Sequence, residues 1–345
     1  MKSLLSSKKL CVLPRISGVG GPASFQLQLV KGLATLGVEV CNDLRDTPYD
    51  AVLVTGGTRQ LVGLWHARRR GVPILQRLAG INWLHRQRRT GLRHFLRAER
   101  GNWLLATIRA RLADGVIYQS QFARAWWERV YHSTPVPAYV VLNGVDLEDY
   151  TPSGSGQRPS DRYRLLMIEG ILGGGYEIGI EHAVGLAERL AGEVGRSVEL
   201  MVVGRVAPAL RERVEHSPEV LLSWVGSVPR DRIPEIDRSA HLLYSADLNA
   251  ACPNSVIEAL ACGLPVVAFE TGALPELVKE DAGRLSPYGG DPWKLDPPDV
   301  DRLAQAALEV LGDQPRFRAN ARMRAEACLG LERMVEGYLA ALGWI

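Results

Sequence analysis

The chain has 345 residues, which is long for one hydrophobic core and predicts two domains of about 150 residues each. A formal net charge of +3 gives no reason to expect a nucleic-acid partner, and no segment approaches the roughly 20 apolar residues that span a bilayer. The first residues lack the apolar core of a signal peptide, and the five cysteines form no Cys-x-x-Cys pair. We therefore expect a cytoplasmic protein with reduced thiols.

The first part of the chain alternates short apolar runs with helical patterns. The expected strands are residues 10–16, 38–42, 50–56, 72–78, 114–120 and 138–144. A Gly-rich loop (18–24) leads into an expected helix at 25–37, and a second helix is expected at 59–71. Strands that alternate with helices predict βαβ units and a parallel sheet covered on both faces.

A segment rich in Ser, Gly, Pro and charge (151–162) interrupts this alternation and is predicted to be a linker. The alternation then restarts, with expected strands at 163–170, 198–204, 220–226, 240–246 and 265–270. We expect an α/β fold of two Rossmann-like, doubly wound domains, 1–150 and 163–325, facing a cleft. A C-terminal helix within 326–345 should pack back onto the first domain. Ligands of such sheets bind at the carboxyl ends of the strands.

The stretch ACPNSVIEALACGLPVVAFETGALPELV (251–278) carries the strongest functional signal. One interpretation is structural: Ser255 caps a helix and Glu258, at its third position, returns a hydrogen bond. The other is functional. The helix-terminal amide groups of Asn254, Ser255 and Val256 suit a phosphate, and Glu258 can accept two hydrogen bonds from a ribose diol. The second interpretation predicts a nucleotide-diphosphate site.

The same stretch resembles the donor-binding signature of the retaining family 4 (group 1) glycosyltransferases of GT-B fold. Segments 18–40, 113–124 and 140–152 resemble the family's Gly-rich loop, its Ala-Asp segment and its Asn-Gly-Val-Asp segment, in that order. The resemblance implies transfer of a sugar from a nucleotide-diphosphate-sugar to a glycan or glycolipid hydroxyl, as in polysaccharide biosynthesis, with retention of configuration. It implies no metal and no cofactor, since the nucleotide-sugar is the co-substrate.

The resemblance also assigns roles to particular residues. It places Glu258 on the ribose hydroxyls and the backbone of residues 254–256 on the diphosphate. Gly20 and Gly21 would let the backbone of the first domain approach the donor or the acceptor.

The chain departs from the family pattern on the donor side. The first of the family's two glutamates corresponds to Ala250, beside Asn249. The Arg and Lys that neutralise the diphosphate correspond to Gly170 and Gly175. Backbone amides of Gly173 and Gly174 could form an anion-binding nest in that loop.

Other residues could compensate for these losses. Arg205 and Arg230, each just after an expected strand, could supply the lost charge. On the acceptor side Ala79 replaces the family's frequent His or Asp, so we assign no catalytic residue, and only Arg77 and Asn82 are expected there. A non-catalytic sugar-nucleotide binding module remains open, and so does an epimerase, which would need acid and base residues that we do not find.

Residues 65–111 are rich in Arg and Trp and contain one acidic residue, Glu99. Apolar residues recur there at roughly helical spacing: Leu92, Phe95, Leu96, Trp103, Leu104, Ile108 and Leu112. This pattern fits a helix that packs an apolar face inward with solvated arginines. It also fits a basic amphipathic surface that meets anionic lipid on the inner membrane face. The segment contains no nucleic-acid recognition motif, and the seven histidines show no metal-ligand spacing.

Overall fold

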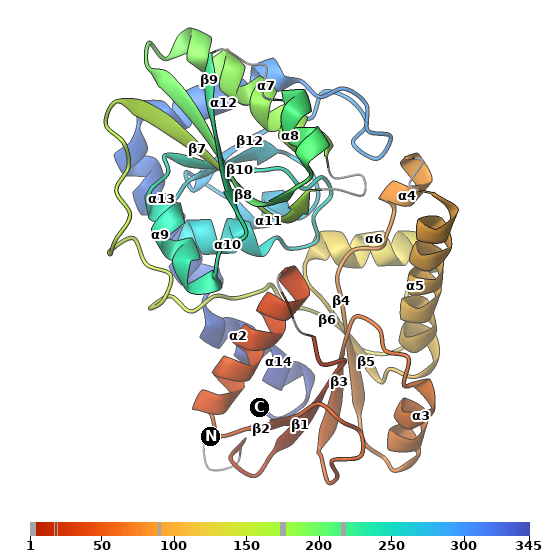
Figure 1. Cartoon of the computed structure of the whole chain (residues 1–345). Helices are drawn as coiled ribbons and strands as arrows, with labels where there is room; N and C mark the ends of the chain where they lie inside the picture. Colours follow the sequence, from red (N-terminus) through yellow and green to blue (C-terminus); the bar gives the residue numbers. More distant parts are fainter. Residues whose placement is uncertain (1–4, 17, 19, 89–90, 173–176, 215–218) are drawn as a thin grey trace. The chain divides into compact units, whose positions relative to one another are not determined.

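The structure is a computed structural model and describes the chain except residues 1–4, 17, 19, 89–90, 173–176 and 215–218. The chain divides into two compact units, one formed by residues 1–144 with 331–345 and the other by residues 145–330 (Figure 1). Each unit contains a six-stranded parallel sheet with helices against it. The predicted fold class, two doubly wound α/β domains, is confirmed.

The first unit has the strand order β2-β1-β3-β4-β5-β6. Its strands are β1 (Lys9–Leu13), β2 (Glu39–Cys41), β3 (Ala51–Thr55), β4 (Ile74–Leu78), β5 (Gly115–Tyr118) and β6 (Ala138–Val140). Its helices are α2 (Gly21–Thr35), α3 (Leu61–Arg69), α4 (Leu84–Gln87), α5 (Leu92–Arg111), α6 (Gln121–Tyr131) and α14 (Leu331–Ala341).

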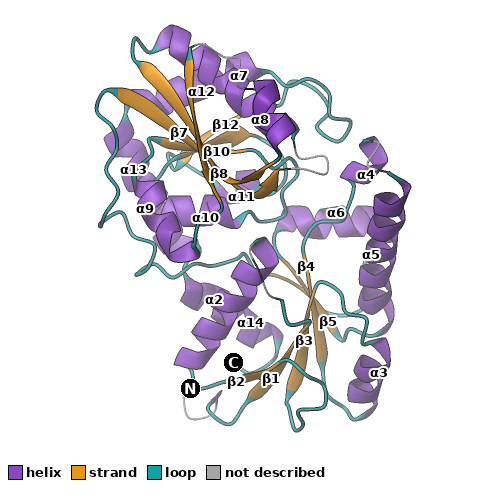
Figure 2. Cartoon of the chain, in the orientation of Figure 1, coloured by secondary structure: helices purple, strands orange, loops and turns teal. Residues whose placement is uncertain are grey.

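Side-chain alternation divides the core of the first unit between the two faces of its sheet. On β1, Leu10 and Val12 join one buried cluster, which includes residues of α2 and α14, while Cys11 and Leu13 join another, which includes residues of α3 and α5. Figure 2 shows these helices against the strands. Strands buried on both faces have apolar side chains at successive positions, and this explains the continuous apolar runs in the sequence.

Helix α14 belongs to the first unit, although the second unit precedes it in the chain. Phe25 and Tyr338 place their ring centroids 5.4 Å apart across α2 and α14. A Cβ atom on Gly32 would lie 2.4 Å from Cγ2 of Val335, so the two helices approach closely only because residue 32 is glycine. The expected return of the C-terminal helix to the first domain is confirmed.

The second unit has the strand order β12-β11-β10-β7-β8-β9. Its strands are β7 (Arg162–Leu172), β8 (Ser197–Val206), β9 (Val220–Gly226), β10 (Leu242–Ser245), β11 (Val266–Phe269) and β12 (Gly283–Ser286). Its helices are α7 (Ile178–Glu193), α8 (Pro208–Val214), η1 (Arg230–Arg232), α9 (Ile233–Arg238), α10 (Asn254–Ala261), α11 (Leu274–Leu277), α12 (Val300–Gly312) and α13 (Gln314–Cys328).

The boundaries of the units differ from the expected 150 and 326. The first unit ends at Gly144, and the predicted linker (151–162) is part of the second unit. Hydrogen bonds explain the difference: Val145 N donates to Leu329 O (2.9 Å), and Arg322 on α13 donates to the carbonyl oxygens of Leu147 and Tyr150. The sequence showed that the periodicity stops at residues 151–162, but it did not show that this segment packs against the second unit.

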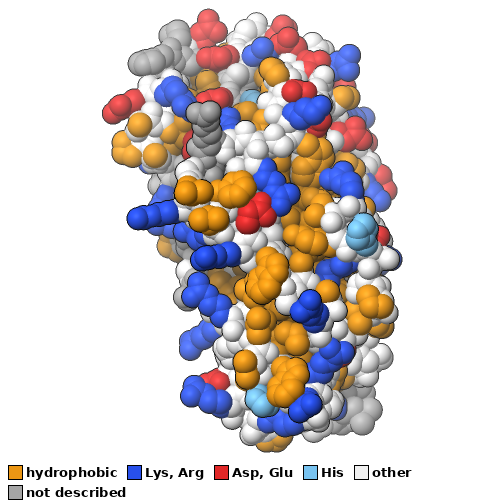
Figure 3. Space-filling view, turned by 90° about the vertical axis from the view of Figure 1, so that its right-hand side faces the viewer, with side chains coloured by type: hydrophobic (Ala, Val, Ile, Leu, Met, Phe, Trp, Pro, Cys, Tyr) orange, Lys and Arg blue, Asp and Glu red, His pale blue; other side chains and the backbone are white. Residues whose placement is uncertain are grey.

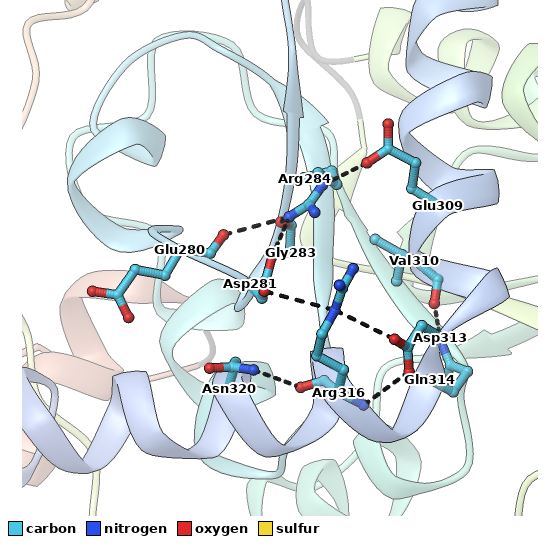
Figure 4. A network of polar contacts seen from close by, with 10 residues as sticks. All are labelled: Glu280, Asp281, Gly283, Arg284, Glu309, Val310, Asp313, Gln314, Arg316 and Asn320. Atoms are coloured by element: carbon cyan, nitrogen blue, oxygen red, sulfur yellow. Dashed lines mark hydrogen bonds and ion pairs between the residues drawn. The ribbon is translucent and has the colours of Figure 1, made fainter.

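An ion-pair network connects the outer elements of the second unit (Figure 4). Arg284 on β12 donates to Glu309 on α12 (2.7 Å) and to Asp281 (2.9 Å). Arg316 on α13 lies 3.6 Å from the same Asp281 and 3.4 Å from Asp313. These contacts hold α12 and α13 against the edge strand of the sheet.

Candidate nucleotide-sugar site

Helix α10 starts at Asn254, with Pro253 as its N-cap, and no side chain makes a capping hydrogen bond there. Ser255 and Glu258 are therefore the second and fifth helical residues, and they do not form a capping box. The structural interpretation of this pair is wrong. The register shifts because proline at the N-cap has a fixed φ and leads directly into the helix.

Glu258 is buried and has a specific charged partner. Its side chain is 11% exposed, and Nη2 of Arg230 donates to its Oε1 atom at 2.9 Å. Nε of Arg230 also donates to the Tyr150 hydroxyl at 3.4 Å. A buried carboxylate requires a charged, hydrogen-bonded partner, and Arg230 supplies it for Glu258 at the start of α10.

The first amide groups of α10 precede the first hydrogen bond of the helix. That bond runs from Ile257 N to Pro253 O at 3.4 Å, so the amides of Asn254, Ser255 and Val256 lie at the positive end of the helix. Val256 is fully buried as a whole residue, whereas Asn254 and Ser255 are half-buried, so the accessible part of this helix start lies at Asn254 and Ser255. Helix-terminal amides next to the ion pair of the half-buried Arg230 and the buried Glu258 form an arrangement that suits an anion with adjacent hydroxyl groups.

The loop before α10 is tightly packed around the position of the missing glutamate. Ala250 is buried, and its carbonyl accepts a hydrogen bond from Ala273 N at 2.8 Å. A Cβ atom on Gly272 would lie 2.6 Å from the Ala250 backbone. The adjacent Asn249 has φ 57° and is buried, and its Nδ2 atom has no hydrogen-bond partner among the described residues. Asn249 thus holds a polar donor beside the alanine.

Two acidic residues that the sequence analysis did not single out lie at the same edge of the sheet. Glu169 is near the carboxyl end of β7, and Asp247 follows the adjacent parallel strand β10. Burial raises the pKa of both carboxyl groups, and the charge of Asp247 raises the pKa of Glu169 further. The pair therefore retains a proton at a pH where ordinary carboxyls are ionised. The sequence could have indicated this pair, because each acid lies near the carboxyl end of an expected strand and ligands bind at those ends.

Asp237 on α9 is a further buried acid near Glu258. Burial raises its pKa well above the usual range, and the nearby charge of Glu258 acts in the same direction. Asp237 is fully buried, so its carboxyl group favours the neutral form. Of these two acids, Glu258 is the one with an arginine partner, Arg230.

The structure describes two of the four glycines that the sequence analysis assigned to donor binding, Gly20 and Gly21. Gly20 is the N-cap of α2 with φ 128°, and a Cβ atom on Gly20 or Gly21 would meet nothing within 4 Å. The positive φ angle at position 20 favours glycine there. Open space adjoins both Gly20 and Gly21. Gly173 and Gly174 lie outside the described residues, as does Gly175.

The two residues assigned to the acceptor side lie in the first unit. Arg77 is 4% exposed; its Nη2 donates to Asn143 Oδ1 at 2.8 Å, and its guanidinium lies 3.5 Å from the Phe25 ring centroid. Asn82 is exposed and is held by Asn102, whose Oδ1 accepts from both its backbone and its side chain at 3.0 Å. These contacts position both residues, and their roles toward an acceptor stay predictions.

The second unit matches a known family. Residues 173–313 match the family model described as glycosyl transferases group 1. A curated relative from Arabidopsis thaliana, which forms part of a phosphatidylinositol N-acetylglucosaminyltransferase, is 25% identical over 182 residues. The match covers 52% of this chain and 38% of that relative, so the chain spans less than half of the relative's length.

Solved structures share the fold over nearly the whole chain. Sucrose-phosphate synthase of Thermosynechococcus elongatus has a TM-score of 0.71 at 17% identity, covering 98% of this chain and 99% of that one. Anabaena HepE, solved in complex with UDP and glucose, has a TM-score of 0.69 at 17% identity, covering 98% and 100%. At these identities the comparison shows the fold alone, which is GT-B.

Proposed function

We propose that the chain is a glycosyltransferase with a nucleotide-diphosphate-sugar donor, on the premise that residues 173–313 of the second unit match the group 1 glycosyl transferases. The observation that carries the proposal is the buried Glu258, ion-paired to Arg230 at the start of α10. Glu258 would accept hydrogen bonds from the ribose hydroxyls. The amides of residues 254–256 would bind the diphosphate.

Arg230 would supply part of the positive charge that the family pattern places at Gly170 and Gly175. A guanidinium binds phosphate oxygens in a planar, two-point geometry, and Arg230 already lies 2.9 Å from the carboxylate that would bind the ribose. Arg205, near the end of β8, is exposed and is a second candidate for the same role.

We propose retention of configuration without a metal ion or a protein base. The leaving diphosphate would take the acceptor proton on the face from which it departs, while the protein supplies position and charge stabilisation. The proton then passes from the acceptor hydroxyl to a diphosphate oxygen, and the C–O bond to the sugar forms as the bond to the diphosphate breaks. Activity that is unchanged by EDTA, with NMR showing the donor's anomeric configuration in the product, would support this mechanism.

The acceptor class is proposed as a glycolipid or polysaccharide precursor at an anionic membrane surface. Leu92, Phe95, Leu96 and Trp103 on α5 are exposed, and so is Trp65 on α3. Figure 3 shows apolar side chains mixed with Lys and Arg on the side of the first unit that carries these helices. Among the described residues, no helix is long and apolar enough to cross a bilayer. The name of the Arabidopsis relative includes a lipid, which supports this class.

The proposal is tested by calorimetric titration of the intact protein with UDP, GDP and ADP and their sugar conjugates. We expect one nucleotide to bind at micromolar strength and Glu258→Ala to weaken its binding about tenfold or more, which corresponds to about 1.4 kcal/mol. Glu309→Ala is the matched control, because it removes a carboxylate from an exposed Arg–Glu pair (Figure 4). If no nucleotide binds, or both variants bind like the wild type, the donor site is wrong.

A non-catalytic binding module is the second candidate, and the alanine at position 250 favours it. A glycosyltransferase would release the nucleotide from its sugar donor, whereas a binding module would not. Binding of a nucleotide-sugar without release of the nucleotide, with membrane extract as the source of acceptor, would favour the module.

A further inference from the structure

A hollow of about 400 Å³ lies in the second unit and shares no lining residue with the proposed donor site. Its lining consists of Pro152, Gly156, Gln157, Arg158, Arg238 and Arg318. The volume lies within the range of roughly 300–1,000 Å³ that is typical of small-molecule sites. Half of these residues are arginines, so the lining is strongly basic.

The segment between residues 151 and 158 is fixed against α9 and forms one wall of the hollow. Nε of Arg238 donates to Ser155 O at 2.6 Å, and its Nη1 atom donates to Thr151 O at 3.0 Å. Gly156 has φ 102°, and a Cβ atom there would lie 2.1 Å from Glu235 O. Only glycine permits this approach, so the wall is a built feature of the fold.

The three arginines lack a neutralising carboxylate. None of Arg158, Arg238 and Arg318 forms an ion pair within the part of the chain that the structure describes. Two acids close in sequence have other arginine partners, each at 2.8 Å: Glu235 pairs with Arg232, and Asp161 pairs with Arg162. Asp237, next to Arg238 in sequence, is fully buried and forms no ion pair among the described residues. Arg318 donates only to the carbonyl of Ala240, at 3.2 Å, among the described residues.

The pKa values of neighbouring titratable groups reflect the same excess of positive charge. Burial lowers the pKa of Arg318 to about 10, and the charge of Arg158 contributes to the decrease. Burial also lowers the pKa of His241 to about 4, and Arg158 and Arg318 contribute there too. Asp237, the nearby acid, is buried with a raised pKa and so favours its neutral form. Placing guanidinium groups together without a counter-charge costs free energy, which a bound anion would recover.

We propose that this hollow binds the phosphate group of a small soluble molecule, with Arg158, Arg238 and Arg318 as its ligands. Guanidinium groups match phosphate oxygens with paired N–H donors, and clusters of arginine are a common means of phosphate recognition. The volume exceeds what one phosphate needs, so the hollow admits a phosphate monoester, whose organic part would lie against Pro152 and Gln157. This site is separate from the donor site and does not depend on the proposed glycosyl transfer.

Inorganic phosphate is the first probe, titrated calorimetrically into the intact protein at constant ionic strength. We expect saturable binding, and we expect Arg158→Gln to weaken it about tenfold. Arg158 is exposed and makes no hydrogen bond to the described residues that the substitution would remove, so this variant should fold normally. Arg302→Gln is the charge-matched control and should bind phosphate like the wild type, since Arg302 is an exposed partner of Asp299.

Glu258→Ala separates this site from the donor site. It should weaken nucleotide binding and leave the binding of inorganic phosphate unchanged, while Arg158→Gln should weaken phosphate binding and leave nucleotide binding unchanged. The proposal is overturned if no phosphate binds up to about 10 mM, or if Arg158→Gln binds it like the wild type. Binding to vesicles that contain phosphatidate, without any response to inorganic phosphate, would also overturn it, because the ligand would then be a lipid headgroup.

Discussion

Arg230 and Glu258 form an ion pair at the start of α10, in the stretch for which we propose donor binding. The family pattern places cations at positions that correspond to Gly170, which lies within β7, and to Gly175. Here Arg230, the first residue of η1, lies 2.9 Å from the carboxylate of Glu258. The sequence indicated Arg230 as a possible substitute only from its position after a strand, because its distance to Glu258 depends on how α9 and α10 pack.

At the same scale, Glu169 and Asp247 predict a pH dependence of stability. Both pKa values are raised in the folded chain, so the folded state binds more protons than the unfolded state between the ordinary values and the raised ones. Stability should therefore decrease as the pH rises through this window. We expect urea unfolding between about pH 5 and pH 9 to show the decrease, and we expect Asp247→Asn to reduce it.

Asp301→Asn is the control for this experiment, because the Asp301 side chain is 80% exposed. It should leave the pH profile unchanged. A profile that is flat in the wild type, or equally steep in the Asp247 variant, would contradict the assignment of the protonated pair.

At the scale of the element, α5 carries both buried and exposed apolar residues. Ala98 and Ile108 are buried, whereas Leu92, Leu96 and Trp103 are exposed. One helix thus supplies both a buried face and an apolar, basic surface. The sequence showed the helical periodicity but not which of its apolar residues are buried.

This division predicts binding to membranes through the first turns of α5. Replacing Leu92, Phe95 and Leu96 together by serine should weaken binding to vesicles of anionic lipid at least tenfold, because each side chain would otherwise bury apolar area in the interface. Cosedimentation is the measurement. Leu221→Ser, at an exposed apolar residue on β9, should have no effect. Unchanged binding of the triple variant would exclude this face.

The packing of α2 on α14 gives a second prediction for elements. Gly32→Ala should lower the stability of the first unit, because its Cβ atom would lie 2.4 Å from Val335 Cγ2. Overpacking costs roughly 1–3 kcal/mol, which exceeds the gain of about 1 kcal/mol in helix propensity.

Gly192→Ala on α7 is the matched control. A Cβ atom there meets nothing within 4 Å, so the same substitution should stabilise the chain slightly. Urea unfolding followed by circular dichroism measures both variants. If Gly32→Ala stabilised the protein, α14 would have to move away from α2 without a loss of packing free energy, which would contradict the prediction.

At the scale of the whole molecule, the last residues of the chain stabilise the first unit. Leu339 on α14 is fully buried in the cluster that contains Leu10 and Phe25. Leu339→Ala should destabilise the first unit by about 2–5 kcal/mol through the cavity it leaves, and should leave nucleotide affinity in the second unit unchanged. Differential scanning calorimetry with and without nucleotide separates the two units. Met323→Ala, at an exposed residue of α13, should change stability by less than about 0.5 kcal/mol.

The sequence by itself determined the alternation of strands and helices, the division into two α/β domains and the place of Glu258 near the start of a helix. These follow from local periodicity and from residue types such as proline and glycine. The tertiary structure alone decided that α10 starts at Asn254 without a capping box and that Arg230 is the partner of Glu258. It also decided that residues 151–158 form a wall of an arginine-lined hollow. These features depend on packing between segments distant in sequence, which no local pattern encodes.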